Sequence, residues 1–132
     1  MREYKCTIGG KELKLVANFA ASQRIAKEVA DPLMISREAF VEAMMISANM
    51  SYEPKWSFDV DNIWRLVLIG VEAGGDSIDK QQLQELIFEE GFFNVRRMAE
   101  EYLALIVGPT PEELDTNSAE SKAEGNLVGS TS

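Results

Sequence analysis

Apolar and polar residues alternate along residues 4–16, and two adjacent glycines interrupt the alternation at its centre. A period of two is typical of a β-strand with one buried face, and Gly-Gly can supply the positive φ angles of a tight hairpin turn. An isolated hairpin is marginally stable in water, so we expect its apolar face to pack on the rest of the protein. With Gly9 and Gly10 in the turn, the residues that share this face are paired as Ile8 with Lys11, Cys6 with Leu13, and Tyr4 with Leu15.

Beyond the hairpin, the spacing of apolar residues changes to that of α-helices and indicates five short helices. Capping residues, glycines and prolines suggest where each one begins and ends. We expect helices to follow the N-cap candidates Asn18, Ser36 and Asp79, and either Ser57 or Asp59. The expected ranges are about 19–30, 37–50, 60–73, 80–90 and 93–107.

The predicted helices differ in the width of their apolar faces. The helix over 60–73 has the broadest face, so we expect it to be the most buried. Two aromatic residues in the connection before it, Trp56 and Phe58, are expected to pack back onto the helices. The first helix has a narrow stripe made of Phe19, Ser22, Ile25, Ala26 and Val29. The second has a stripe made of Phe40, Val41, Met44, Met45 and Ala48.

The whole pattern predicts an α+β fold, mainly α, with the N-terminal β-hairpin packed on a compact bundle of about five short helices. We expect residues 1–108 to form a single globular domain. The composition then changes, because residues 110–132 contain five acidic side chains, one lysine and no aromatic residue. Such a segment buries too little apolar surface to offset its ordering entropy, so residues 109–132 are predicted to form an acidic, disordered tail.

Composition and charge narrow the classes of partner. The 132 residues carry a net charge of −9, from 22 acidic and 13 basic side chains. The largest basic group is the pair Arg96–Arg97, so we do not expect nucleic acid binding. No apolar run approaches the roughly 18 residues of a membrane span, and the first residues lack the apolar core of a secretory signal. The single cysteine, Cys6, suits a reducing compartment, and we expect the protein in the cytoplasm.

Side chains that commonly carry catalysis or bind metals are scarce. Histidine is absent, and one cysteine falls short of the four donors of a zinc site. No glycine-rich loop connects a predicted strand to a predicted helix. Neighbouring carboxylates such as Glu89–Glu90 and Glu100–Glu101 point to different sides of a helix, and we interpret them as solvated or capping groups. We therefore expect no enzymatic activity, no metal and no cofactor.

Apolar side chains outside the hairpin are better candidates for a functional surface than the carboxylates are. Methionine clusters fill irregular cores, and they also form adaptable binding surfaces. Both interpretations stay open, because these residues can belong to the core or can line a groove or dimer face. The candidate partner-binding residues are Met44, Met45, Met50, Trp56, Phe58, Phe92 and Phe93.

The hairpin and the helix after it carry a family resemblance. The residues that carry it are Ile8, Gly9, Gly10, Lys11 and Glu12, then Leu13 and Leu15, then Arg24, Ile25 and Val29. In an acidic protein of this size, such a hairpin followed by a compact run of helices resembles the phage tail assembly chaperones of siphophages and gene transfer agents. The resemblance covers about residues 4–107, and its one local signature is the hairpin.

This resemblance implies a non-enzymatic role. Proteins of that family bind the tape measure protein, keep its long apolar helices soluble and help to recruit tail tube subunits. It therefore implies a tape measure protein and a tail tube protein as partners, the bacterial host cytoplasm as the location, and absence from the mature virion. No catalytic residue is carried over from the family.

Two other classes of protein fit the same sequence. One is a structural adaptor or connector that is retained in the virion. The other is an acidic regulatory module that binds a basic protein through residues 109–132. Self-association through apolar faces also stays open at this point.

Overall fold

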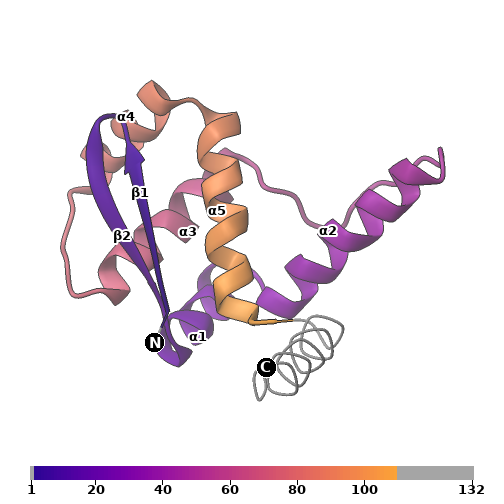
Figure 1. Cartoon of the computed structure of the whole chain (residues 1–132), viewed down its shortest axis with the longest axis horizontal. Helices are drawn as coiled ribbons and strands as arrows, with labels where there is room; N and C mark the ends of the chain where they lie inside the picture. The colour runs from indigo at the N-terminus through magenta and orange to yellow at the C-terminus, as the bar shows by residue number, and fades with distance from the viewer. Residues whose placement is uncertain (1, 110–132) are drawn as a thin grey trace, which may run out of the picture.

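A computed structural model describes residues 2–109, and within that range a two-stranded antiparallel sheet precedes five helices (Figure 1). The predicted class, α+β and mainly α with an N-terminal hairpin, is confirmed. The predicted tail lies outside the described residues from residue 110 onward. The strands are β1 (Arg2–Ile8) and β2 (Lys11–Ala17). The helices are α1 (Phe19–Glu28), α2 (Pro32–Ser47), α3 (Val60–Ala73), α4 (Lys80–Glu90) and α5 (Phe92–Val107).

The longest of these helices, α2 and α5, have 16 residues each. Within residues 2–109, none of the helices combines the length and the apolar character needed to cross a bilayer.

The hairpin has the predicted register. Gly9 and Gly10 have φ angles of 58° and 82°, which a primed two-residue turn requires. Pairing continues beyond the predicted segment, to Arg2 opposite Ala17. The three predicted pairs are present, as Ile8 with Lys11, Cys6 with Leu13, and Tyr4 with Leu15.

Helix α3 lies at the centre of the molecule, against the hairpin, and it is the most buried helix, as predicted. Gly70 lets the helix approach β2 closely, since a Cβ atom at that position would lie 2.7 Å from the Cβ atom of Leu15. On α5, the buried Tyr102 donates its hydroxyl to the carbonyl oxygen of Val16 over 2.7 Å. The hairpin is thereby fixed to both α3 and α5.

Three helices begin at the predicted N-caps. The side-chain oxygens of Asn18, Asp59 and Asp79 each accept a hydrogen bond from the backbone N–H three residues later. These bonds satisfy backbone donors that have no partner within the first turn of a helix.

The predicted start of α2 after Ser36 is wrong, because the helix begins at Pro32. The carboxylate of Asp31 accepts a hydrogen bond from the N–H of Leu33 over 2.9 Å, so Asp31 is the N-cap. Proline is well tolerated at the first helical position, where its missing N–H would lack a helical partner in any case. The Asp31–Pro32 pair therefore opens a helix here instead of only ending the one before.

The predicted stripe of α1 is only partly correct. Ile25 is fully buried, but Phe19 is 76% exposed and Ala26 is exposed. The second buried residue of α1 is Ala21, one turn before Ile25. The small side chain of Ala21 lets the start of the helix lie close to the core, and the apolar Phe19 is left at the surface.

Candidate protein-binding surfaces

The second half of α2 projects away from the body of the molecule (Figure 1). Only its first two turns are held, because Pro32, Ile35 and Glu38 are its buried residues. We call residues 39–50 the α2 arm. No residue of the arm is buried, although the sequence pattern gives it a helical apolar stripe. Its exposed large side chains are Phe40 (66%), Met44 (55%), Ile46 (67%) and Met50 (57%).

A buried carboxylate fixes the base of the arm. Glu38 is 5% exposed, and it accepts hydrogen bonds from the hydroxyl of Tyr52 over 2.5 Å and from the N–H of Lys55 over 3.3 Å. The Tyr52 hydrogen bond holds the pKa of the Glu38 carboxyl below its ordinary value, and it raises the pKa of Tyr52. Glu38 thus ties the returning connection, residues 48–59, to α2.

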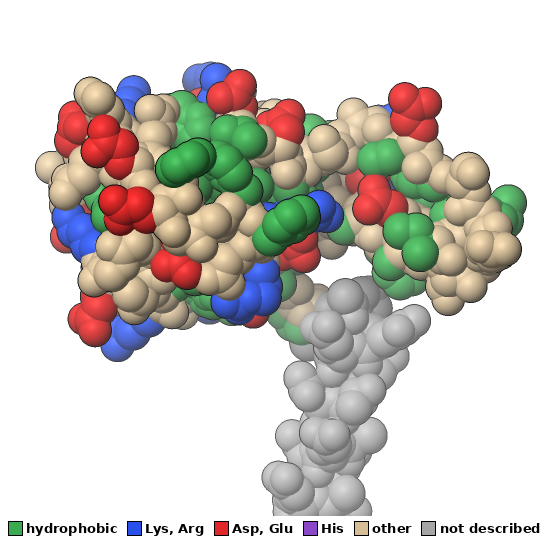
Figure 2. Space-filling view, turned by 90° about the horizontal axis from the view of Figure 1, so that it is seen from above, with side chains coloured by type: hydrophobic (Ala, Val, Ile, Leu, Met, Phe, Trp, Pro, Cys, Tyr) green, Lys and Arg blue, Asp and Glu red, His purple; other side chains and the backbone are tan. Residues whose placement is uncertain are grey.

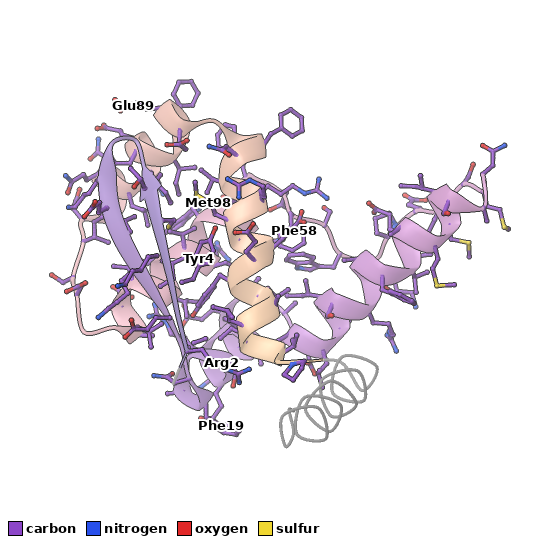
Figure 3. The ribbon with its side chains drawn as sticks, viewed as in Figure 1. Arg2, Tyr4, Phe19, Phe58, Glu89 and Met98 are labelled. Carbon is purple, nitrogen blue, oxygen red and sulfur yellow. The ribbon has the colours of Figure 1, made fainter. Side chains whose placement is uncertain are left out.

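The two aromatic residues of that connection pack inward, as predicted. Trp56 and Phe58 are half-buried against the core, and their rings meet edge to face with centroids 4.8 Å apart. The guanidinium carbon of Arg96, on α5, lies 5.6 Å from the centroid of the Phe58 ring. Figure 3 shows Phe58 in the space between α5 and α2. These rings support the base of the arm.

Two grooves flank the base of the arm, and Ala39 and Phe58 line both of them. One, of about 300 Å³, lies between α2, the connection and α5. The other, of about 600 Å³, extends to the C-terminal end of α5, where Leu103 and Val107 contribute apolar walls and Arg2 contributes a positive charge. Of the four exposed large side chains of the arm, Ile46 lines the smaller groove, whereas Phe40, Met44 and Met50 lie outside both.

A second apolar surface lies where α4 meets α5. We call Phe88, Phe92 and Phe93 the phenylalanine corner. Phe88 is 73% exposed, Phe92 36% and Phe93 91%. The rings of Phe88 and Phe92 meet edge to face with centroids 6.0 Å apart. Figure 1 places this corner at the top of the body, where α4 meets α5, and the tip of the α2 arm at the far right.

The candidate residues therefore fall in three places and do not form one surface. The methionines belong to the arm, with Met44 and Met50 exposed and Met45 half-buried. Trp56 and Phe58 belong to the support beneath the arm, and Phe92 and Phe93 belong to the corner. The space-filling view is consistent with separate surfaces, because hydrophobic side chains gather over the main body and again on the projecting part at the right (Figure 2).

Sequence reasoning missed several residues of these surfaces. Phe88 is the clearest case, because it is 73% exposed and was not among the candidate partner-binding residues. Ile46 was likewise outside the predicted stripe of α2. Glu38 carries no local signal, since its role depends on the path of the connection.

Two ionisable groups on β1, Tyr4 and Cys6, have raised pKa values. Burial, with help from the carboxylates of Glu101 and Glu90, raises the pKa of the Cys6 thiol to about 11. Burial and the hydrogen bond to Glu101 raise the pKa of Tyr4 to about 12. Both groups are protonated at neutral pH, so neither is a ready nucleophile or general base. Among the described residues, His, Cys, Asp and Glu form no cluster that could hold a metal ion.

No family model, no curated protein and no solved structure matches this chain.

Proposed function

We propose that this protein is a non-enzymatic tail assembly chaperone that binds a long helical client, the tape measure protein, on the α2 arm. The observation that carries the proposal is a projecting helix whose large apolar side chains face solvent. Phe40, Met44 and Ile46 are each more than half exposed. In the free protein these apolar side chains are hydrated, and burying them against a client is favourable because it removes apolar surface from water.

The free energy available from covering these side chains can be approximated from their size. Fully burying one large apolar side chain is worth about 1.5–3 kcal/mol. Phe40 and Met44 lie one turn apart on the same side of α2, and covering most of their exposed surface offsets part of the entropy lost on association. Methionine adds adaptability, since its flexible thioether can repack against different side chains of a client.

The shape of the surface favours a helical client. An amphipathic helix binds by laying its apolar stripe into a groove, with anchors spaced three and four residues apart. The arm offers apolar side chains at similar spacing, with Phe40 and Met44 one turn apart, and hollows at its base. No residue of the arm is buried, and most of the stability of helices in proteins comes from packing. A client would stabilise the arm while the arm covers the client.

The acidic charge fits the same role. A net charge of −9 keeps copies apart and keeps a complex with an apolar client dispersed. Together with the resemblance of the hairpin and helices, this supports a cytoplasmic chaperone of the bacterial host that is absent from the mature virion. The tail tube protein is the second partner that the resemblance implies.

The test is co-expression of the full chain with the tape measure protein of the same genome. We expect the soluble yield of the tape measure protein to rise severalfold and a complex to be recovered. The double variant Phe40→Ser/Met44→Ser removes apolar surface from the arm and should abolish the gain. Phe19→Ser is the matched control, because Phe19 is 76% exposed at the end of α1 and outside the arm (Figure 3).

The proposal fails if the tape measure protein stays insoluble with the unmodified chain, or if the arm variant and the control solubilise it equally well. Mass spectrometry of purified particles separates the adaptor alternative, because an adaptor stays with the virion. Deleting residues 110–132 separates the regulatory alternative, because that change would abolish binding through the tail and leave binding to the arm intact.

A further inference from the structure

The phenylalanine corner displays aromatic side chains that contribute little to the fold. Phe93 is 91% exposed, so its ring has almost no buried contact within the described chain. Phe88 is 73% exposed, and among residues 2–109 its ring meets that of Phe92. Exposed single apolar residues are common, but three phenylalanines within six residues make a patch. Large aromatic side chains are also the residues that most often anchor protein–protein interfaces.

The corner is held rigidly on the hairpin turn. Gly91, with a φ angle of 99°, ends α4 and begins α5, which sets the angle between the two helices. The carboxylate of Glu90 accepts hydrogen bonds from the N–H of Gly9 over 3.0 Å and from the side-chain amide of Asn94. Leu86 packs directly against Gly9. A surface that is already ordered costs little conformational entropy when it binds.

The corner also has an acidic edge. Phe88 shares a shallow hollow with Glu85 and Glu89, and Gln81 and Gln84 complete its lining. Within residues 2–109, neither Glu85 nor Glu89 takes part in an ion pair. Figure 3 shows Glu89 at the outer end of α4.

The two arginines of α5 do not neutralise this acidic edge. Arg96 and Arg97, in the second turn of α5, are each paired with a glutamate four residues later, at 2.8 Å and 3.1 Å. Their positive charges are therefore already balanced by Glu100 and Glu101. Figure 2, which is the view from above, shows hydrophobic side chains on this side of the molecule with acidic side chains and some basic ones around them.

We propose that the phenylalanine corner is a second protein-binding surface, separate from the α2 arm, and that its partner is a basic amphipathic segment. Apolar side chains of the partner would cover Phe88 and Phe93, while its lysines or arginines would pair with Glu85 and Glu89. Charge complementarity selects this partner over a second copy of the chain. A second copy carries the same net charge of −9 and the same two carboxylates, so self-pairing would bring like charges together.

The corner lies at the top of the body, and the arm extends away from the body to the right (Figure 1). One chain could therefore hold two different segments at once. Linking two binding events in this way raises the effective concentration of the second segment near the first. The inference does not depend on the proposed function of the arm, because it rests on different residues and is tested with a different probe.

The test uses a fluorescein-labelled 18-residue synthetic peptide that forms an amphipathic helix with leucines on one face and lysines on the other. A second peptide with glutamate in place of every lysine is the charge control. Binding of each peptide to the full chain is followed by fluorescence anisotropy at low and at physiological salt. We expect binding of the lysine peptide to weaken as salt is raised, and no binding of the glutamate peptide.

Variants then locate the binding site. Phe88→Ser/Phe93→Ser should weaken binding of the lysine peptide by about tenfold or more, as for interface anchors. Glu85→Gln/Glu89→Gln should weaken binding at low salt and reduce its salt dependence. The exposed control Phe19→Ser should bind like the unmodified chain. Circular dichroism of each variant establishes that it has folded.

The proposal is overturned if the lysine peptide does not bind the unmodified chain. It is also overturned if both corner variants bind the peptide as well as the unmodified chain does, or if only the arm variant Phe40→Ser/Met44→Ser loses binding. A dimer of the unmodified chain that dissociates in Phe88→Ser/Phe93→Ser, seen by sedimentation, would assign the corner to self-association and would equally overturn it.

Discussion

At the scale of single residues, the hairpin turn shows how one glycine serves two requirements. Gly9 has a φ angle of 58°, and a Cβ atom there would lie 2.9 Å from both the Cδ2 atom and the carbonyl oxygen of Leu86. Gly10 has a φ angle of 82°, but a Cβ atom there would meet nothing within 4 Å. The turn requires positive φ at both positions, and only Gly9 is also needed for contact with α4.

This difference predicts unequal effects of substitution. Gly9→Ala should lower the free energy of unfolding by about 1–3 kcal/mol, because it adds a steric conflict with backbone to the strain of positive φ. Gly10→Asn should cost less than about 1 kcal/mol, since asparagine tolerates this region and the space is open. Urea denaturation of both variants measures the difference. Equal effects would mean that the turn does not pack on α4.

Glu38 has an equally specific structural role, because it accepts hydrogen bonds from the connection that follows α2. Its pKa is lowered in the folded state, chiefly by the hydrogen bond from Tyr52. A carboxyl with a lowered folded pKa contributes stability above its unfolded pKa of roughly 4.3 and loses that contribution as the pH falls through the folded pKa. The ionised form of Glu38 is therefore the form that holds the connection to α2.

Glu38→Gln should consequently destabilise the protein more at pH 7 than at pH 3, where the wild-type carboxyl is protonated. Thermal unfolding of the variant and of the unmodified chain across this range measures the difference. Tyr52→Phe removes the donor and should show the same trend. A stability difference that is constant with pH would contradict a specific role for the ionised carboxylate.

At the scale of elements, α2 shows what the pattern could and could not predict. The helical periodicity identified the apolar residues of its stripe but placed its start five residues too late. The reason is that Asp31–Pro32 is compatible both with the end of one helix and with the start of the next. Periodicity also cannot say whether a stripe is covered, because coverage depends on where the connection of residues 48–59 runs.

The position of the helix start gives a direct prediction. Asp31→Ala removes the N-cap hydrogen bond and should cost about 1 kcal/mol of stability. Ser36→Ala, at the position first expected to be the cap, lies inside the helix and should change stability by less than about 0.5 kcal/mol. Chemical denaturation compares the two variants. A larger loss for Ser36→Ala would contradict the observed start of α2.

At the scale of the whole molecule, local signals were enough for the architecture. The Gly9–Gly10 turn and strict alternation specify the register of the hairpin. The broad apolar face of α3 identifies it as the central helix. The division of the candidate residues between the α2 arm, the connection and the phenylalanine corner could not be predicted. It depends on the angles between helices, which are determined by contacts between residues far apart in the sequence, such as Gly9 with Leu86.

The same separation gives the molecule two exposed apolar surfaces, and the net charge of the chain is negative. The arm is the second half of α2, with large apolar side chains in water, and the corner is a turn with an acidic edge. Binding at the arm is the central claim, because the proposed chaperone role depends on it.

Hydrogen–deuterium exchange of the full chain, alone and with the tape measure protein, tests that claim most directly. In the free protein, backbone amides of residues 40–47 should exchange much faster than those of α3, because the arm lacks packing. In the complex, exchange over residues 40–47 should slow by at least about tenfold. Unchanged exchange over the arm in a complex that demonstrably forms would contradict the account.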